Sequence, residues 1–521
     1  MGRERTNKRI DRTFPTLEKE RRKKRLYSLL DSTPIEYLLH AVWQIRQLQS
    51  ENSCTTNFFY RIPQEWRVTK PGERFFFYQW RLETLINVRL ERHKNSPLLP
   101  FRLLNLKEPN SFLLLWDALH RFENSLDKIS LKNHDVFEEM FRLTRRQFEW
   151  QQGFSNAQRW LLYCTIFHGK ECKKAFFEKH EVELDLFVKF GFAVVAVLSN
   201  SFRIAKSSDF KVFGISDSIR DKCWMILSAS VDRISEECVE LRRNFGDSVY
   251  APSILRNRPC ISFGDYLVAP LTECIHSRVT DGIYYDVIKS GAARSEFGNL
   301  LEEHVLQMLQ LFPSGFKIYP EFSYGSPVKH SPDVFIAQAD KLRLVMEIKA
   351  SRLTARSRFS SAPTTEVPDD FESVAKGCVQ LWRYVSDSSK GLFPRNLTIE
   401  PSTVLILACL DRWVGPEIFK ENSLLEMANR LADKQGISRD IQIRRKIVFC
   451  TVDDIEYILA KGDLCSFVET SGFANNGNYQ GWLLSSVFDE KFKASSRNES
   501  QLAAVWDRLK VKLPWLKELD S

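Results

Sequence analysis

The sequence predicts an α/β protein, in which a C-terminal domain with a mixed central sheet flanked by helices follows a mainly α-helical domain. With 521 residues, the chain is long enough for two or three domains. Apolar residues recur at three- and four-residue spacing between residues 33 and 244, which is typical of amphipathic helices. From residue 296 onward, strand patterns alternate with helical patterns. Together these patterns indicate the fold class and the order of the domains.

A basic arm opens the chain over residues 1–30. It holds eleven Lys or Arg residues against four acids, including the run Arg21-Arg22-Lys23-Lys24-Arg25. Such a run suits contacts with nucleic-acid phosphates, while a solvated helix start or a frayed arm is the alternative interpretation. The net charge of +9 agrees with both, because alone it argues only for nonspecific attraction to phosphates.

Residues 31–255 are expected to form the helical domain. Residues 35–49 and 137–152 show helical spacing, and the run Phe75-Phe76-Phe77-Tyr78 is expected in the core. The region contains no repeat and no Gly-rich phosphate loop. We therefore expect this domain to sense a target or to dock a partner, and we assign it no chemistry.

Residues 256–470 are expected to form the α/β domain. It begins with a strand over residues 261–271 and a helix over 284–288. The core elements that follow are helix 297–312, strand 316–322, hairpin strands 332–338 and 342–350, helix 371–387, strand 403–410, helix 424–434 and strand 446–452. The polar stretch 351–370 is expected to be a mobile loop. Residues 471–521 are expected to form a packing segment with a helix over 502–516.

Composition predicts a cytoplasmic protein without a membrane segment. The longest apolar run, residues 190–198, is too short to span a bilayer, and no apolar segment follows the basic N-terminus. The eleven cysteines are scattered singly, without a Cys-x-x-Cys pair or zinc-ligand spacing. We therefore expect reduced, mostly buried thiols.

The main candidate catalytic residues lie on the predicted hairpin. Side chains alternate between the faces of a strand, so an apolar layer on one face is expected to hold Leu342, Leu344, Met346 and Ile348. Glu347 and Lys349 then share the other face. If the loop is Ala339-Asp340-Lys341, the register places Asp333 directly opposite Glu347, about 5 Å away at Cβ. Two carboxylates at that separation repel each other unless a cation such as Mg²⁺ or Mn²⁺ lies between them.

The triplet Glu347-Ile348-Lys349 is not informative by itself. A second Glu-x-Lys triplet, Glu171-Cys172-Lys173, occurs in a helical context without a hairpin. The triplet becomes informative only through its register with Asp333 and the apolar strand around it. The alternative is an exposed two-stranded ribbon with a lateral Glu/Lys pair.

Two helices add candidate residues. In helix 297–312, Glu302 shares a face with the apolar positions, whereas Glu303 lies on the polar face. An inward Glu needs a partner such as a metal or Lys349, unless it reaches water at the margin of the apolar stripe.

In helix 371–387, Gln380 and Tyr384 share a face with Lys376, and Arg383 borders it. This stripe is expected either to contact a nucleic-acid strand or to be an ordinary solvated face.

These motifs resemble the PD-(D/E)xK nuclease superfamily, which has a restriction-endonuclease-like fold. The resemblance covers about 160 residues, 296–452, and rests on the order of helix, three strands, helix and strand. Pro332-Asp333 precedes Glu347-Ile348-Lys349 by a typical gap, and the segment around Glu302 is similar to the family's helix-borne Glu. Gln380-Leu381-Trp382-Arg383-Tyr384 resembles the Gln-x-x-x-Tyr signature of the RecB-like and phage-exonuclease branch. No resemblance covers the N-terminal half.

The resemblance implies a Mg²⁺- or Mn²⁺-dependent deoxyribonuclease. Asp333 and Glu347 would hold the ion, together with the Ile348 carbonyl and Glu302. Lys349 would orient the attacking water and stabilise charge on the phosphate.

Five further residues are expected to contact nucleic acid. Gln380 and Tyr384 would hold the strand or the scissile phosphate by the same resemblance. Arg352, Arg356 and Arg358 are assigned to the phosphate backbone from their charge and position alone.

Three functional hypotheses follow. The first is an active DNA nuclease of bacterial restriction or phage defence, or of a mobile element. The second is a non-cleaving nucleic-acid-binding module, which the intact set of Asp333, Glu347 and Lys349 argues against. The third is the nuclease subunit of a multi-protein complex. Because the chain has no P-loop motif, ATPase activity would then come from a protein partner.

Overall fold

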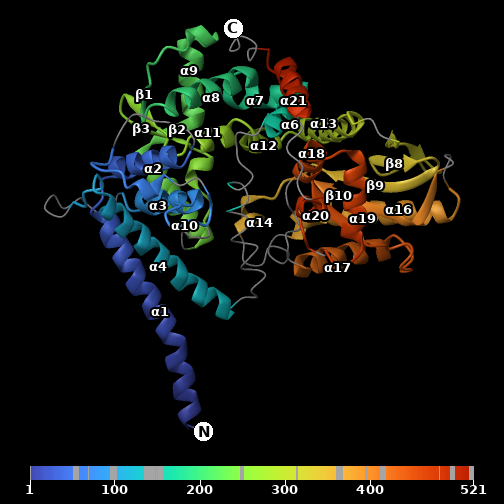
Figure 1. The fold of residues 1–521 in the computed structure, drawn as a ribbon, viewed down its shortest axis with the longest axis horizontal. Coiled ribbons are helices and arrows are strands. Elements are labelled where there is room, and N and C mark those ends of the chain that lie inside the picture. The colour runs from blue at the N-terminus through green and yellow to red at the C-terminus, as the bar shows by residue number, and fades with distance from the viewer. Residues whose placement is uncertain are drawn as a thin grey trace. The chain divides into compact units, whose positions relative to one another are not determined.

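The computed structural model describes residues 2–50, 58–67, 70–93, 103–133, 147, 150, 157–246, 251–312, 315–359, 368–392, 397–410, 418–479, 481–492 and 499–514. The chain divides into two compact units (Figure 1). The N-terminal unit comprises Met1–Ser155 and Phe176–Asp286, and the C-terminal unit comprises Asn156–Ala175 and Val287–Ser521. No helix in the described part of the chain is both long and apolar enough to cross a membrane.

The units differ from the predicted domain ranges 31–255 and 256–470 at two points. Residues up to Asp286 join the N-terminal unit, because strands β3 (Cys260–Phe263) and β4 (Tyr266–Val268) pair with strands of that unit. Residues 156–175 join the C-terminal unit, because helix α6 (Ala157–Phe167) packs there against helices α13 (Gly291–Gln310) and α21 (Glu499–Lys512). Both differences depend on contacts between residues that are far apart in the sequence.

Helices make up most of the N-terminal unit. They are α1 (Gly2–Asp31), α2 (Ile35–Gln49), α3 (Gln79–Glu91), α4 (Pro109–Asn133), the end of α7 (Lys170–His180), α8 (Leu184–Leu198), α9 (Asp217–Leu227), α10 (Val231–Phe245), α11 (Glu273–Arg278) and the start of α12 (Tyr284–Val287). Single 3-10 turns cover Gln64–Trp66, Lys211–Phe213, Ile254–Arg256 and Asp281–Ile283. The mainly helical character predicted for this region is therefore confirmed, while the predicted helix 137–152 lies almost entirely outside the described residues.

A small sheet joins these helices, in the order β1 (Arg203–Ala205), β4, β3 and β2 (Ser228–Ser230). The prediction of one strand over residues 261–271 is wrong. Gly264, at φ +64°, turns the chain so that Phe263 pairs with Tyr266. Two short antiparallel strands therefore replace the single long one.

Aromatic side chains fill the core of this unit. Trp66, Phe77 and Phe112 are each no more than 1% exposed, and the rings of Trp66 and Phe77 lie 5.0 Å apart. The predicted core position of Phe77 is thus confirmed. Helix α1 extends from this core and is anchored there by Leu26 and Leu30 (Figure 1). The segment predicted as a basic arm, residues 1–30, therefore lies, from Gly2 onward, within helix α1.

The C-terminal unit is built on a five-stranded mixed sheet. Its strands have the order β11 (Ile447–Thr451), β10 (Thr398–Cys409), β9 (Lys341–Lys349), β8 (Val334–Gln338) and β5 (Lys317–Pro320). Strands β9, β10 and β11 run parallel, whereas β8 is antiparallel to both β9 and β5. A ribbon of β6 (Ser323–Tyr324) and β7 (Lys329–His330), which the sequence did not predict, lies between β5 and β8 in the chain.

Helices flank this sheet, as predicted. They are α6, α13 (Gly291–Gln310), α14 (Ala355–Phe359), α16 (Pro368–Ser389), α17 (Ile418–Lys434), α18 (Val452–Lys461), α19 (Leu464–Asn475), α20 (Leu484–Lys491) and α21 (Glu499–Lys512). Helix α16 packs on β9 and β10, and α17 packs against α16 (Figure 1). Their shared core includes Val345, Leu407 and Val374. The predicted order of helices and strands is therefore present.

Candidate metal centre

The hairpin of β8 and β9 positions the candidate centre. Gln338 pairs with Lys341, so the turn is the two-residue Ala339-Asp340, with Ala339 at φ +53°. The prediction of a three-residue loop is wrong in this detail. A bulge at Arg343 then shifts the register by one residue, and beyond it Val334 pairs with Met346. The shorter turn and the bulge cancel, so the predicted register holds at the chemically important end.

The bulge also changes which face Leu342 occupies. Leu342 belongs to the same core cluster as Val345 and Phe335, beside α16. It therefore does not share a face with Leu344, contrary to the prediction, because an inserted residue inverts the alternation of side chains. Beyond the bulge the alternation resumes, and Val345, Glu347 and Lys349 face the α16 side.

Asp333 and Glu347 meet at the open end of this hairpin. Continuing the register beyond Val334 and Met346 places them opposite each other. Asp333 Oδ2 accepts a hydrogen bond of 2.5 Å from the backbone N–H of Ile348. Glu347 is only 1% exposed, because β9 lies between β8 and β10. This burial excludes the alternative of an exposed two-stranded ribbon.

Lys349 links the hairpin to α16. Its ammonium donates to Glu347 Oε1 at 2.6 Å and to Gln380 Oε1 at 3.0 Å. Gly377 allows this approach, since a Cβ there would lie 2.6 Å from Leu407 Cδ1 and 2.9 Å from Lys349 Cε. Gly377, which makes room for the lysine under the helix, was not predicted from the sequence.

Two more carboxylates complete the group. Oxygen atoms of Glu302, Glu321 and Asp333 lie within 4.8 Å of one another. Glu302, from α13, is half-buried, whereas Glu303 is exposed and accepts a 2.7 Å hydrogen bond from Gln307. The predicted inward orientation of Glu302 is thus confirmed.

Glu321 was not predicted. It directly follows β5, whose Pro320 pairs with Val334, so the continued register places it beside Asp333. The pairing of β5 with β8 could have revealed it. However, the intervening β6–β7 ribbon leaves no short turn from which to read that register.

Three of these carboxylates, Glu302, Asp333 and Glu347, have raised pKa values because they are buried to different degrees and lie near one another. Burial raises the pKa of Glu302 to about 7, with further contributions from Asp333 and Glu321. Burial also raises the pKa of Asp333 and of Glu347, and the Asp333 charge adds to the shift of Glu347. Burial lowers the pKa of Lys349, but the neighbouring carboxylates, Glu347 first, outweigh it and raise the value overall. One lysine faces several acids.

The chemistry of these residues fits a hard divalent cation. Glu347 Oε2 is buried and has no hydrogen-bond partner among the described residues. Asp333 uses Oδ2 for the Ile348 N–H, which leaves Oδ1 for another contact. Mg²⁺ and Mn²⁺ prefer such carboxylate oxygens and retain water in their remaining positions. An ion here would meet the unsatisfied oxygen and would offset the repulsion among the acids.

Only some of the residues predicted to contact nucleic acid lie near this group of carboxylates. Gln380 reaches it through Lys349, but Tyr384 is 2% exposed, with its ring 5.1 Å from that of Phe335 in the core. The expected polar stripe on α16 is therefore interrupted. The physical cause is that Tyr384 faces the sheet, where its ring packs on Phe335, so that Lys376 alone of the three residues in the stripe is exposed.

The arginines after β9 have different environments. Arg352 is 5% exposed, Arg356 on α14 is exposed, and Arg358 is half-buried. Of the three, only Arg356 presents its side chain openly to solvent. The predicted mobile loop 351–370 contains helix α14, and residues 360–367 lie outside the described part.

A scan against protein-family models matched no family, and searches of curated proteins and of solved structures returned no match.

Proposed function

We propose that the C-terminal unit is a metal-dependent nuclease of the PD-(D/E)xK type, which hydrolyses phosphodiester bonds of DNA. The observation that carries the proposal is the convergence of Asp333, Glu347 and Lys349 in one buried group with an unsatisfied carboxylate oxygen. The element order α13, β5, β8, β9, α16 and β10 supports it, since the resembled family arranges its core in this order.

The acidic residues of the group would hold the metal ion. Asp333, Glu347 and Glu302 would hold a Mg²⁺ or Mn²⁺ ion, with Glu321 at the edge and the Ile348 carbonyl as the resemblance implies. The ion supplies positive charge that polarises the phosphate and favours ionisation of water. The protein's own contribution is to bring these carboxylate oxygens close together, although burial disfavours their ionised form until a cation is present.

Lys349 is the basic residue of the centre. Its ammonium, held by Glu347 Oε1 at 2.6 Å, would orient the attacking water and stabilise the charge that develops on the phosphate. Gln380 accepts from the same ammonium at 3.0 Å and therefore positions it. Gly377 leaves the space that the lysine chain occupies.

An activity assay tests the proposal. The purified full-length protein is incubated with linear, circular and single-stranded DNA and with RNA, in Mg²⁺ or Mn²⁺, beside Asp333→Ala and Lys349→Ala. Asp340→Ala is the matched control, because Asp340 is an exposed acid in the turn of the same hairpin. We expect the wild type and the control to cut DNA and the two site variants to be inactive. Absence of cleavage by the wild type, or equal cleavage by the site variants, would refute the proposal.

A further inference from the structure

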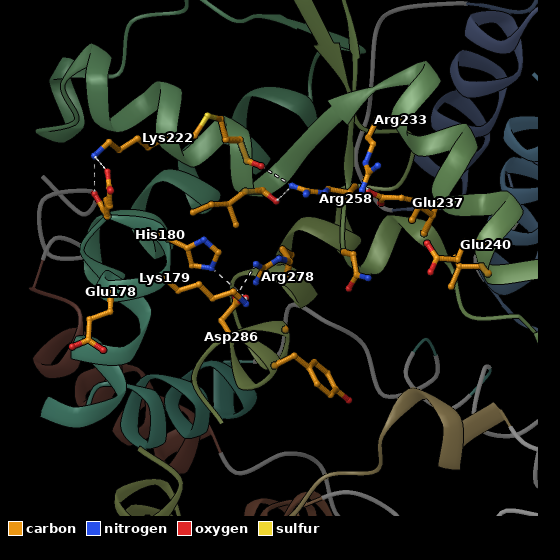
Figure 2. Close-up of a pocket in the computed structure, with 18 of the residues that line it drawn as sticks. Glu178, Lys179, His180, Lys222, Arg233, Glu237, Glu240, Arg258, Arg278 and Asp286 are labelled. Carbon is orange, nitrogen blue, oxygen red and sulfur yellow. Dashed lines mark hydrogen bonds and ion pairs between the residues drawn. The ribbon is translucent and has the colours of Figure 1, made fainter. Parts of the chain in front are cut away.

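A cavity of about 870 Å³ opens in the N-terminal unit (Figure 2). It is lined by the end of α7, by α9, α10 and α11, and by the turn that leads to Asp286. Its volume is within the range of small-molecule sites, about 300–1,000 Å³. Most of its labelled side chains are charged, so a polar ligand suits it better than an apolar one.

Arg278 is the buried cation of this cavity. Its side chain is 8% exposed, it lies over the Phe187 ring at 5.6 Å, and its Nη2 is 2.7 Å from Asp286 Oδ2. Its Nη1 is buried and has no hydrogen-bond partner among the described residues. A buried donor without an acceptor is destabilising, and a ligand oxygen would supply the missing acceptor.

The surroundings of Asp286 are positively charged overall. Besides Arg278, Lys179 Nζ lies 2.5 Å and His180 Nε2 lies 3.2 Å from Asp286 Oδ1, and Figure 2 shows these groups converging on the carboxylate. Burial raises the pKa of Asp286, but these basic neighbours outweigh it and hold the value far below its usual range. One carboxylate thus faces the fixed charges of Lys179 and Arg278, with His180 as a further neighbour, so the two cations exceed its single negative charge.

A second arginine, Arg258, lies in the wall of the same cavity. Arg258 Nη1 donates to the backbone carbonyls of Met225, at 2.6 Å, and Ile226, at 3.2 Å. These bonds fix the guanidinium in the cavity wall, as Figure 2 shows. A guanidinium fixed in advance loses little conformational entropy when it binds a phosphate.

Acidic groups also line the wall. Glu178 and Glu181 lie at the end of α7, where Glu181 pairs with Lys222 at 2.9 Å. Glu237 and Glu240 come from α10, and Arg233 pairs with Glu237 at 3.0 Å. Carboxylates accept hydrogen bonds from hydroxyl and amino groups but repel an anion. The cavity is therefore divided into an anion-accepting part around Arg278 and a donor-accepting part on α10.

We propose that this cavity binds the phosphate monoester of a small polar molecule. The phosphate contacts Arg278, Lys179 and His180, since guanidinium and ammonium groups are suited to phosphate oxygens. The hydroxyl or amino groups of the body face Glu237 and Glu240. Nucleoside and sugar phosphates share this chemistry. The proposal does not depend on the nuclease assignment.

Isothermal titration calorimetry on the full-length protein tests this site. The probes are AMP and glucose 6-phosphate as monoesters with different bodies, inorganic phosphate, and adenosine, which has no phosphate. We expect at least one monoester to bind and adenosine not to bind. Which of the two monoesters binds more tightly identifies the body as nucleoside or sugar.

Variants separate this site from general charge attraction. Lys179→Gln is expected to weaken monoester binding about tenfold, and Arg278→Lys, which keeps the charge, is expected to weaken it further by removing the planar fork. Lys211→Gln is the control, because Lys211 is an exposed lysine of the same unit outside the cavity. Lys179→Gln also guards against misfolding of the buried variant, since Lys179 is 46% exposed.

Three results would overturn the proposal. One is the absence of monoester binding at millimolar concentration. Another is an affinity for AMP that is no higher than the affinity for adenosine or for inorganic phosphate. The third is an equal loss of affinity in Lys179→Gln and Lys211→Gln.

Discussion

The two units each bury an acidic centre, and the two centres have opposite charge balance. Asp286 in the N-terminal unit meets Lys179, His180 and Arg278, and its pKa is lowered. In the C-terminal unit, Glu347 shares a single lysine with other carboxylates, and its pKa is raised. Burial acts in the same direction on both acids. The comparison teaches that the number of basic neighbours decides whether a buried acid is satisfied or still needs a cation.

The largest predicted effect concerns activity at the cation-deficient centre. Glu347→Gln keeps the shape of the side chain but removes its charge, so we expect DNA cleavage to fall by about 10²–10³-fold. Single-turnover cleavage at saturating Mg²⁺ measures the effect. Asp340→Asn, in the exposed turn of the same hairpin, is expected to retain full activity. Comparable losses in both variants would show that the effect is not specific to the centre.

The second effect concerns stability at the cation-rich centre. Asp286→Asn leaves buried cations without their counter-charge, so we expect a loss of about 3 kcal/mol in unfolding free energy. By contrast, Glu302→Gln removes a repelled carboxylate and is expected not to destabilise the metal-free protein. Urea denaturation of both variants in EDTA measures the difference. A destabilisation of similar size in the two would remove the contrast between the centres.

The third effect concerns the space above Lys349. Gly377→Ala adds a methyl group within 2.6 Å of Leu407 and 2.9 Å of Lys349, so the lysine must shift. We expect kcat to fall about tenfold, because displacing a catalytic group by a fraction of an ångström weakens its action. Gly472→Ala is the control, since a Cβ there meets nothing within 4 Å. Steady-state kinetics of both variants decides, and unchanged kcat in Gly377→Ala would contradict the role of this close approach.

The smallest effect is the pH dependence of stability without metal. The pKa of Glu302 is about 7 in the folded protein, against an ordinary value of 4.5. Between these values the folded protein holds a proton that the unfolded chain releases, so stability falls as pH rises from 4.5 through 7. Because Glu302 is partly solvated, we expect a loss of about 1 kcal/mol.

Thermal unfolding in EDTA from pH 4.5 to 8 measures this loss. We expect Glu302→Gln to flatten the profile and Mg²⁺ to restore stability of the wild type at pH 8. A wild-type profile that is already flat, or that rises over this range, would contradict the charge balance assigned to the centre.

The sequence predicted the order of elements in the C-terminal unit and the encounter of Asp333 with Glu347. Alternation and turn length are local properties, so a hairpin can be inferred from them. The predicted loop was nevertheless one residue too long, and the bulge at Arg343 compensated for it. The inward orientation of Glu302 likewise followed from helical spacing.

The residues that were missed depend on long-range packing. Glu321 reaches the group only because β5 pairs with β8, and Gly377 matters only because α16 crosses over Lys349. Tyr384 is buried because its ring packs against Phe335 of β8, a contact between residues far apart in the sequence. The cavity around Arg278 collects residues from several helices, and no local spacing signals it.

Manganese binding followed by electron paramagnetic resonance tests the central claim most directly, namely that the carboxylate group around Asp333 and Glu347 holds a divalent cation. Mn²⁺ is titrated at pH 8 into the wild type, Asp333→Asn and Asp340→Asn, and the free-ion signal is measured. We predict that the wild type and Asp340→Asn remove Mn²⁺ from solution with the same affinity, whereas Asp333→Asn binds at least tenfold more weakly. Equal binding by all three proteins, or no binding by the wild type at millimolar Mn²⁺, would contradict the account.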